Sequence, residues 1–386
     1  MSMASTIADR RFSFDRPALI KRLRELLPAD ALRLEDEQMR PYECDGLTAY
    51  RQLPLLVALP ENEAQAQAIL KICHELRAPV VARGAATGLS GGATPHPDGV
   101  LVSLARLKRI LSIDPLSRTA VVQPGVRNLA VSEAAAPYGL YYAPDPSSQI
   151  ACTIGGNVAE NSGGVHCLKY GLTVHNVMRV RGLTIAGEIV EFGNAALDAP
   201  GYDLLALING SEGLLVMTTE VTLRLTPKPE LAQVVIASFD DVRRAGDAVA
   251  GIIAAGIIPA GLEMMDRKAV QAVEPYVHAG YDTDAEAILL CESDGTPEEV
   301  AEEIGRMTAV LEGSGASAFC VSQSEAERLK FWAGRKAAFP AVGRLTPDYL
   351  CMDGTIPRRR LAEMLAAISG LSEKYSLRCA NVFHAG

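Results

Sequence analysis

The sequence contains no Cys-x-x-Cys pair, although its 386 residues include eight cysteines. The cysteines are scattered along the chain, which argues against a zinc ribbon or an iron–sulfur cluster within it. Scattered thiols are typical of a reduced, cytosolic protein. We expect most of them to be small residues of the core.

Clustered positive charge and long apolar runs are also missing. The formal net charge of −9 and the pI of about 5.3 give no general attraction to nucleic acid or anionic lipid. The longest uncharged run, residues 248–262, is shorter than a membrane span and contains glycine and proline. The N-terminus has no apolar signal core. We therefore expect neither nucleic-acid binding nor direct membrane insertion.

Apolar residues are plentiful, at 48% of the chain, and the length exceeds what one core usually needs. Residues 55–81 read as strand, helix and strand, and glycine- and proline-bounded β-like runs follow. This pattern indicates an α+β fold with small mixed sheets. The "TPKPE" stretch near Thr226 is a plausible linker. We expect an N-terminal helical segment (1–50), a first domain (51–228) and a second α+β domain (229–386).

Glycine is concentrated in "RGAATGLSGG", residues 83–92, directly after a predicted strand. The backbone N–H groups of such a loop can point into one concavity and hold a phosphate or pyrophosphate. The loop matches neither Gly-x-x-x-x-Gly-Lys-Ser/Thr nor a Gly-x-Gly-x-x-Gly that opens a helix. Taken alone, it is equally consistent with an ordinary glycine-rich surface loop.

Two further stretches change that balance. One is residues 141–171, in which two prolines stiffen the segment that leads to Gly155 and Gly156. These two glycines would let the backbone lie against a flat ligand, and residues 161–164 are expected to form a tight turn. The third stretch is "NGSEGLL", residues 209–215. Three such loops, far apart in sequence, predict one extended cofactor held from several sides.

These motifs resemble the flavin-binding domain of the FAD-linked oxidases of the vanillyl-alcohol-oxidase type, a PCMH-type domain of two subdomains. Within that family the chain is most similar to the FAD-containing large subunits of bacterial glycolate oxidases (glycolate dehydrogenases). The similarity extends through "APDPSSQIAC", "GGVHCLKYGLTVHN", "FWAGRKAAFPAVGR" and "CMDGTIPRR" to the second domain. One residue departs from the family pattern, because Val216 stands where a glycine is expected.

The resemblance implies noncovalent FAD, because the first loop lacks the histidine that some relatives use for covalent attachment. It places the pyrophosphate on residues 83–92 and the isoalloxazine near residues 146–164. The FAD-binding residues that it implies are Arg83, Gly84, Ala85, Thr87, Gly88, Leu89, Ser90, Gly91, Gly92, Pro144, Asp145, Pro146, Ser147, Ser148, Ile154, Gly155, Gly156, Asn157, Asn161, Gly163, Gly164, Gly171, Glu212 and Gly213.

In the second domain, "RLKFWAGRKAAFP" places Trp332, Arg335 and Phe339 on a predicted helix. An arginine can hold a carboxylate through two parallel hydrogen bonds, which would orient a 2-hydroxy acid. A single arginine is more often a solvated surface residue. The resemblance implies that Arg335 binds the substrate carboxylate.

His384 lies in the last predicted strand and is followed by Ala385 and Gly386. A lone histidine in a strand is more often structural. The resemblance identifies it as the first residue of a His-x-Gly-Asp-Gly-Asn-x-His motif, whose two histidines and a later glutamate bind a divalent metal such as zinc, with a neighbouring histidine as general base. The sequence ends after the third position, so we expect a chain truncated inside this motif and an incomplete second domain.

The resemblance implies FAD-dependent oxidation of a small 2-hydroxy acid, glycolate to glyoxylate. Electrons would leave through a second flavin-fold subunit and an iron–sulfur subunit, in the cytoplasm or peripherally at the inner face of its membrane. D-lactate and D-2-hydroxyglutarate dehydrogenases share these motifs and are the alternatives within the enzyme class. An FAD-binding fragment or assembly module without turnover is the alternative of another class, since the expected second metal ligand and base are absent.

Overall fold

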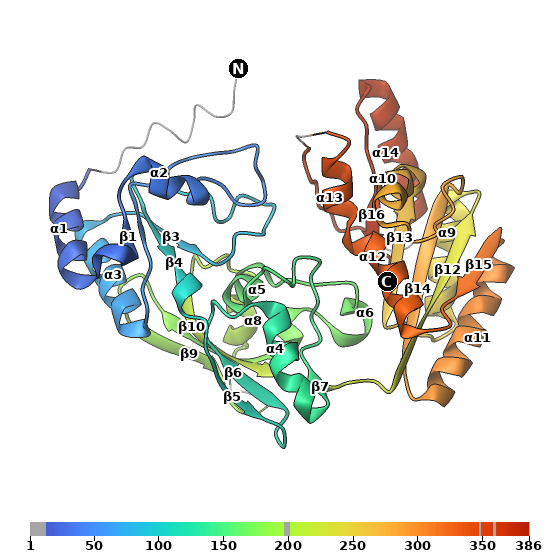
Figure 1. Ribbon diagram of the computed structural model, residues 1–386, viewed down its shortest axis with the longest axis horizontal. Helices are drawn as coiled ribbons and strands as arrows, with labels where there is room; N and C mark the ends of the chain where they lie inside the picture. The colour runs from blue at the N-terminus through green and yellow to red at the C-terminus, as the bar shows by residue number, and fades with distance from the viewer. Residues whose placement is uncertain (1–12, 197–200, 347–348, 358–359, 386) are drawn as a thin grey trace. The chain divides into compact units, whose positions relative to one another are not determined.

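The computed structural model describes residues 13–196, 201–346, 349–357 and 360–385. The chain forms two compact units (Figure 1). The first comprises Met1–Ser162 and Leu172–Pro227, and the second comprises Gly163–Gly171 and Lys228–Gly386. The last division between the units falls between Pro227 and Lys228, and the expected domain bounds stay a prediction. The grouping of residues 163–171 with the second unit, by contrast, is not predicted by the sequence.

The first unit begins with a small mixed sheet. Its strands lie in the order β1 (Leu32–Arg33), β2 (Leu56–Ala58), β4 (Val100–Ser103), β3 (Val80–Arg83). The pairs that β4 makes are parallel, whereas β1 pairs with β2 in the antiparallel sense. Helices α1 (Arg16–Leu26) and α3 (Glu63–Leu76) contribute to the core on this sheet. The short helix α2 (Asp36–Met39) follows β1 in the chain.

The sequence predicts α3 well. Asn62 caps the helix by accepting a hydrogen bond from the backbone N–H of Gln65 at 2.9 Å. Ile69, Ile72 and Cys73 then recur at helical spacing and are buried in the core. This arrangement confirms the strand–helix–strand reading of residues 55–81.

A second, antiparallel sheet completes the first unit. Its strand order is β5 (Ile110–Asp114), β6 (Thr119–Val122), β10 (Met217–Arg224), β8 (Val177–Leu183), β9 (Ile189–Gly193). A two-residue ladder joins β7 (Leu140–Tyr141) to β11 (Thr226–Pro227). The helices of this part are α4 (Asn128–Ala135), α5 (Ile154–Glu160), α7 (Thr173–Asn176) and α8 (Leu204–Ile208). Side chains of α4, α5 and α8 join those of the sheet in one apolar core.

The second unit is built on an antiparallel sheet of five strands. The order is β15 (Ala318–Val321), β12 (Leu231–Phe239), β14 (Ala287–Gly295), β13 (Gly261–Asp266), β16 (Val382–His384). The expected last strand is therefore confirmed, and it lies at the edge of the sheet. The mixture of helices with parallel and antiparallel strands confirms the α+β class.

Helices cover both faces of this sheet. On one face, a core includes residues of α9 (Val242–Ala254), α11 (Pro297–Gly313) and α14 (Leu361–Tyr375). On the other, a core includes residues of α10 (Arg267–Val277), α12 (Glu325–Lys336) and α13 (Ala338–Gly343). Phe383 packs on the first core and Val382 on the second, as the alternation of the strand predicts. The short helix α6 (Cys167–Tyr170) also belongs to this unit.

The cysteines only partly match the expectation. All eight have free thiols, but only Cys73, Cys152 and Cys291 are buried, so the prediction that most lie in the core is wrong. Burial raises the pKa of Cys73 and of Cys291 to about 12, which makes these two thiols poor nucleophiles. Within the described ranges, no helix combines the length and apolar character needed to cross a membrane.

Candidate functional site

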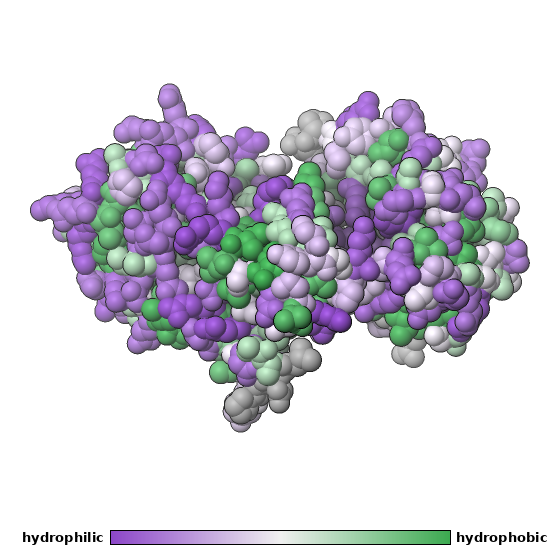
Figure 2. All heavy atoms as spheres, turned by 60° about the horizontal axis from the view of Figure 1, so that its bottom comes forward, coloured by the Kyte–Doolittle hydropathy of each residue, from purple (hydrophilic) through white to green (hydrophobic). Residues whose placement is uncertain are grey.

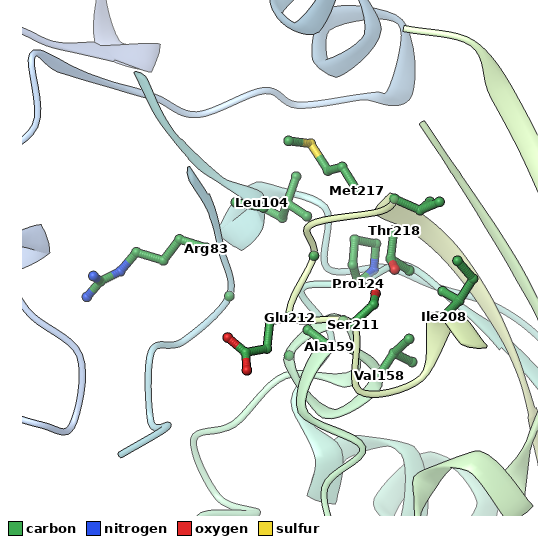
Figure 3. A pocket seen from close by; sticks show the side chains of 16 residues that line it. Arg83, Leu104, Pro124, Val158, Ala159, Ile208, Ser211, Glu212, Met217 and Thr218 are labelled. Carbon is green, nitrogen blue, oxygen red and sulfur yellow. The ribbon is translucent and has the colours of Figure 1, made fainter. Parts of the chain in front are cut away.

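The predicted loops of the first unit converge on one pocket (Figure 3). Its empty volume is about 490 Å³, counting the space open to solvent. Predicted residues that line it are Arg83, Gly84, Gly155, Gly156, Glu212 and Gly213. The other lining residues, which are not among the binding residues predicted by number, are Ala82, Leu104, Pro124, Val158, Ala159, Ile208, Ser211, Val216, Met217 and Thr218. The pocket thus combines glycine backbone with apolar side chains.

The hydroxyl group of Thr153, which is not itself a lining residue, lies beside two lining glycines, Gly84 and Gly156. Thr153 precedes α5 at the capping position, but its side chain does not cap the helix. Its Oγ1 is buried and has no hydrogen-bond partner among the described residues. A Cβ placed on Gly84 would lie only 2.5 Å from this oxygen, so the hydroxyl faces the glycine loop. An unpaired buried hydroxyl is costly unless a ligand or water bonds to it.

The first turn of α5 packs closely on the loop that contains Pro124. The N–H of Gly155 donates to the carbonyl oxygen of Pro124 at 2.8 Å. A Cβ on Gly155 would come within 2.6 Å of the proline Cβ, so only glycine fits here without a shift. Both residues line the pocket. The position of this wall therefore depends on the absence of a side chain at residue 155.

The "NGSEG" stretch is attached to the end of the same helix. The N–H groups of Gly210 and Glu212 donate to the carbonyl oxygens of Val158 and Ala159, each at 2.8 Å. The next residue, Gly213, has a φ of +71°, a conformation that favours glycine. These bonds hold the third predicted loop against the second, which confirms that the two are neighbours.

Arg83 has a structural role at the base of the first loop. Its guanidinium group donates to the carbonyl oxygens of Tyr42 at 3.1 Å and Ala93 at 3.3 Å. It also lies over the ring of Tyr42, 5.5 Å from the centroid. In Figure 3 the side chain points away from Val158 and Ile208. Arg83 therefore anchors both ends of the glycine loop, and its own backbone, rather than the guanidinium group, faces the pocket.

Two carboxylates lie at the far end of the loop. A Cβ placed on Gly92 would lie 3.3 Å from Glu160 Oε1 and 3.3 Å from Glu212 Oε2. Burial, followed by the charges of Glu212 and Asp45, raises the pKa of Glu160 above its ordinary value. Carboxylates repel phosphates and accept hydrogen bonds from hydroxyl groups. The Gly92 end of the loop is thus better suited to sugar hydroxyls than to a pyrophosphate.

Replacing Glu160 by glutamine should stabilise the FAD-free protein at neutral pH. The pKa of Glu160 is higher in the folded protein than in the unfolded protein. Glu160 therefore stabilises the folded state fully only at pH values below its unfolded-state pKa, and this stabilisation is lost as the pH rises through its folded-state pKa. Glu160 is exposed to solvent, which screens its charge, so we expect Glu160→Gln to raise Tm only slightly at neutral pH and by less in mild acid. Thermal unfolding across this pH range measures the effect.

Glu188→Gln is the control, because Glu188 is, like Glu160, an exposed glutamate of the first unit, whereas only Glu160 lies beside Glu212 at Gly92. It should leave Tm unchanged. Equal shifts in the two variants, or a gain for Glu160→Gln that grows in acid, would contradict the assigned cause.

Several predicted FAD-binding residues do not line the pocket. Ile154 and Asn157 are buried, and Asn161 ends α5 in the left-handed conformation, with its Oδ1 accepting the N–H of Val174 at 3.0 Å. In the proline-rich approach, the carbonyl oxygen of Pro144 accepts the side-chain N–H of Asn128 at 3.0 Å. Other predicted residues outside the lining are Ala85, Thr87, Gly88, Leu89, Ser90, Gly91, Gly92, Asp145, Pro146, Ser147 and Ser148. The positions Gly163, Gly164 and Gly171 belong to the second unit.

In the second unit, α12 presents a row of donors to buried carboxylates. Arg328 Nη1 donates to Glu292 Oε2 at 2.8 Å, and Trp332 Nε1 donates to the same oxygen. One turn further on, Arg335 donates to Glu263 Oε2 from Nε at 2.8 Å and Nη2 at 2.7 Å. Arg328, Trp332 and Arg335 follow the spacing of one helix face. Arg335, the predicted substrate arginine, therefore has a buried protein carboxylate as its partner.

His384, the other predicted catalytic residue, bonds to the same glutamate. Its Nδ1 lies 2.7 Å from Glu263 Oε1, and its side chain is 58% exposed. The described residues do not fit the implied metal, because they contain no group of three or more His, Cys, Asp or Glu placed to hold one. The structure thus brings Arg335 and His384 together through Glu263, a residue that sequence reasoning missed.

Two family models match this chain. The family model described as FAD binding domain matches residues 54–193, and the model of the C-terminal domain of FAD linked oxidases matches residues 228–386. The glycolate oxidase subunit GlcD of Escherichia coli (strain K12) is 61% identical over 372 residues, which are 96% of this chain and 74% of that protein. A D-lactate dehydrogenase of Anaerostipes hadrus is 31% identical, over 96% of this chain and 79% of its own.

Among solved structures, 4-ethylphenol oxidase from Gulosibacter chungangensis matches with a TM-score of 0.78 and 15% identity. The match covers 95% of this chain and 80% of that one, and at this identity it shows the fold alone.

Proposed function

The chain belongs to the FAD-linked oxidases, and we propose that it oxidises glycolate to glyoxylate with FAD as its cofactor. The observation that carries the proposal is the 61% identity to a glycolate oxidase subunit along nearly the whole chain. The D-lactate dehydrogenase of Anaerostipes hadrus, at 31% identity, supports the alternative substrate less well.

The pocket of the first unit would hold the cofactor. Gly84, Gly155 and Gly156 expose backbone to the pocket, and the unpaired hydroxyl of Thr153 supplies a hydrogen-bonding group beside them. Apolar side chains such as Val158 and Ile208 form another part of the wall and suit a flat, largely apolar ring. When bound, FAD supplies an acceptor for the hydride that leaves the α-carbon of the hydroxy acid.

The residues of the second unit would handle the substrate. Oxidation of glycolate removes a proton from the hydroxyl group as well as the hydride, so a proton acceptor is needed. The resemblance gives this role to a histidine other than His384, and His384, whose exposed ring bonds to the protein through Nδ1, stays a predicted catalytic residue. Arg335 as the carboxylate-binding residue stays a prediction from the resemblance, because its Nε and Nη2 already bind Glu263. No metal takes part in this proposal, because the described residues do not fit one.

The chain would act within a complex. The relative from Escherichia coli is named as a subunit, so we propose that a second flavin-fold subunit and an iron–sulfur subunit receive the electrons. One face of the molecule carries hydrophobic areas among hydrophilic ones (Figure 2), and exposed large apolar residues of the first unit include Leu204, Leu207, Leu214 and Leu215. Exposed apolar area of this kind supports contact with a partner. A location in the cytoplasm or at the inner face of its membrane stays a prediction.

Steady-state reduction of an artificial electron acceptor tests the substrate. The FAD-loaded protein, in its complex, is assayed with glycolate, D-lactate and D-2-hydroxyglutarate. We expect the highest kcat/KM with glycolate. A higher kcat/KM with D-lactate or D-2-hydroxyglutarate would mean that this acid, rather than glycolate, is the substrate. Tight FAD binding without turnover of any of the three would favour a binding module over an enzyme.

A further inference from the structure

The pocket of the first unit lies between its two sheets. Ala82 and Arg83 of β3 line it from the first sheet, and Met217 and Thr218 of β10 line it from the second. Met217 also joins the apolar core on the first sheet. The distance between the two sheets therefore determines the width of the pocket.

Glu63 connects helix α3 to the second sheet. Residues of α3 pack in the core on the first sheet, and Glu63 is the first residue of this helix. Its carboxylate accepts two hydrogen bonds from Arg181 of β8, with Nε at 2.9 Å from Oε2 and Nη2 at 2.9 Å from Oε1. A bidentate pair of this kind fixes the geometry of both side chains. The hydrogen bonds of Arg181 lower the pKa of Glu63, so its carboxylate is charged at neutral pH.

The same carboxylate binds a β-bulge beside the pocket. In the pairing of β10 with β8, Thr219 is an extra residue between two paired ones. It is buried, and its hydroxyl group donates to Glu63 Oε2 at 2.6 Å. The residue before it, Thr218, lines the pocket. Because a bulge redirects the neighbouring side chains, the bond to Glu63 helps to place this wall.

A second contact of α3 with the second sheet supports the same arrangement. Gln67, one turn after Glu63, donates from Nε2 to the carbonyl oxygen of Gly187 at 2.8 Å. Gly187 lies in the turn between β8 and β9, and a Cβ there would lie 2.6 Å from Lys71 Cγ. The helix is therefore in close contact with the second sheet at two places.

We infer that Glu63 is a positioning residue, which holds the second sheet against α3 and keeps the pocket at the width that FAD needs. We call its contacts with Arg181 and Thr219 the α3 clamp. Glu63 is not a lining residue, so it acts on the pocket through these two partners. Without the clamp the sheets separate more often, and the apparent Kd rises as the fraction of binding-competent molecules falls. The inference rests on the proposed function for the identity of the ligand, FAD.

FAD binding by the Glu63→Gln variant tests the inference. Glutamine keeps the size of the side chain but loses the charge that binds Arg181. We expect Kd for FAD to rise by about 3-fold to 10-fold and FAD to dissociate faster, both followed by flavin fluorescence. With FAD in excess, reduction of the flavin by glycolate should keep its rate. A lower Tm with unchanged Kd and dissociation rate would mean that Glu63 only stabilises the fold, and would overturn the inference.

Glu191→Gln is the matched control. Glu191 accepts a hydrogen bond from the same arginine, with Arg181 Nη1 at 2.7 Å from Oε1, but it lies on β9, which neighbours β8 in the second sheet. This variant takes a carboxylate from Arg181 without releasing the contact with α3. We expect it to bind FAD as the parent does. Equal rises of Kd in Glu63→Gln and Glu191→Gln would refute the clamp.

Thr219→Val keeps the test decisive where Glu63→Gln fails to fold. Valine has the shape of threonine without the hydroxyl group, and Glu63 keeps both bonds to Arg181. We expect a smaller rise of Kd, and less than the sum of the two effects in Glu63→Gln/Thr219→Val, because residues in direct contact are coupled. Unchanged FAD binding in Thr219→Val would contradict the clamp.

The outcomes also separate this inference from the proposed function. The expected changes of Kd in a protein whose flavin is not reduced by glycolate would leave the clamp standing and reject the substrate. Reduction by glycolate, with the same Kd for FAD in Glu63→Gln as in the parent, would reject the clamp and leave the substrate standing.

Discussion

Gly155→Ala is expected to weaken FAD binding by at least roughly tenfold, which corresponds to about 1.4 kcal/mol. The new methyl group would lie 2.6 Å from Pro124 Cβ, and a proline ring cannot rotate out of the way. Helix α5 must therefore move away from Pro124, although both residues line the pocket. Overpacking of this kind typically costs about 1–3 kcal/mol. Titration of the FAD-free variant with FAD, followed by flavin fluorescence, measures the loss.

Gly305→Ala is the matched control. Gly305 also lies in a helix, α11, and a Cβ there would meet nothing within 4 Å. Alanine in place of a helical glycine stabilises by up to about 1 kcal/mol, so this variant should bind FAD as the parent does and melt slightly later. If Gly155→Ala bound FAD with unchanged affinity, the pocket of the first unit would not be the cofactor site.

Arg335→Met is expected to destabilise the second unit by about 3–5 kcal/mol, the cost of leaving one partner of a buried pair unpaired. Arg335 and Glu263 are 7% and 1% exposed at their side chains, and two nitrogens of the arginine bind one carboxylate oxygen. Methionine fills a similar volume but leaves Glu263 without its counter-charge. Urea unfolding, followed by the fluorescence of the chain's one tryptophan, Trp332, reports on this unit.

Arg360→Met is the comparison for a surface pair. Arg360 and Glu363 are 57% and 64% exposed, and such pairs contribute at most about 1 kcal/mol. If Arg335→Met lowered the free energy of unfolding by less than about 1 kcal/mol, as we expect for Arg360→Met, the buried pair of Arg335 and Glu263 would not stabilise the second unit. Such a result would also remove the basis for assigning Arg335 to Glu263.

Local sequence signals predicted the elements well where capping and periodicity agree. Residues 297–313 form a helix because Pro297 suits its first turn and because Thr296 and Glu299 cap each other's backbone. The capped start and the apolar stripe of α3 are equally readable. The glycine loops could also be predicted from the sequence. Where the backbone must come close to a ligand or to another segment, glycine is needed, and the glycine is visible in the sequence.

The residues that sequence reasoning missed depend on tertiary contacts. Glu263 lies in "GLEMMD", and nothing in this short stretch indicates its partners, Arg335 and His384. Thr153 could have been found, because a threonine before a helix is a capping candidate, but only the structure shows that its hydroxyl does not cap. Likewise, residues 163–171 belong to the second unit because of hydrogen bonds between residues far apart in the sequence. Lys169 bonds to Asp294, and His166 bonds to Glu292.

Anaerobic mixing of the FAD-loaded protein with glycolate tests the central claim most directly. We expect the visible absorbance of oxidised flavin to disappear and glyoxylate to form in an amount equal to the flavin, and we expect both changes to slow down with glycolate deuterated at the α-carbon. Unchanged flavin absorbance after glycolate is added, in a protein that demonstrably holds FAD, would contradict it.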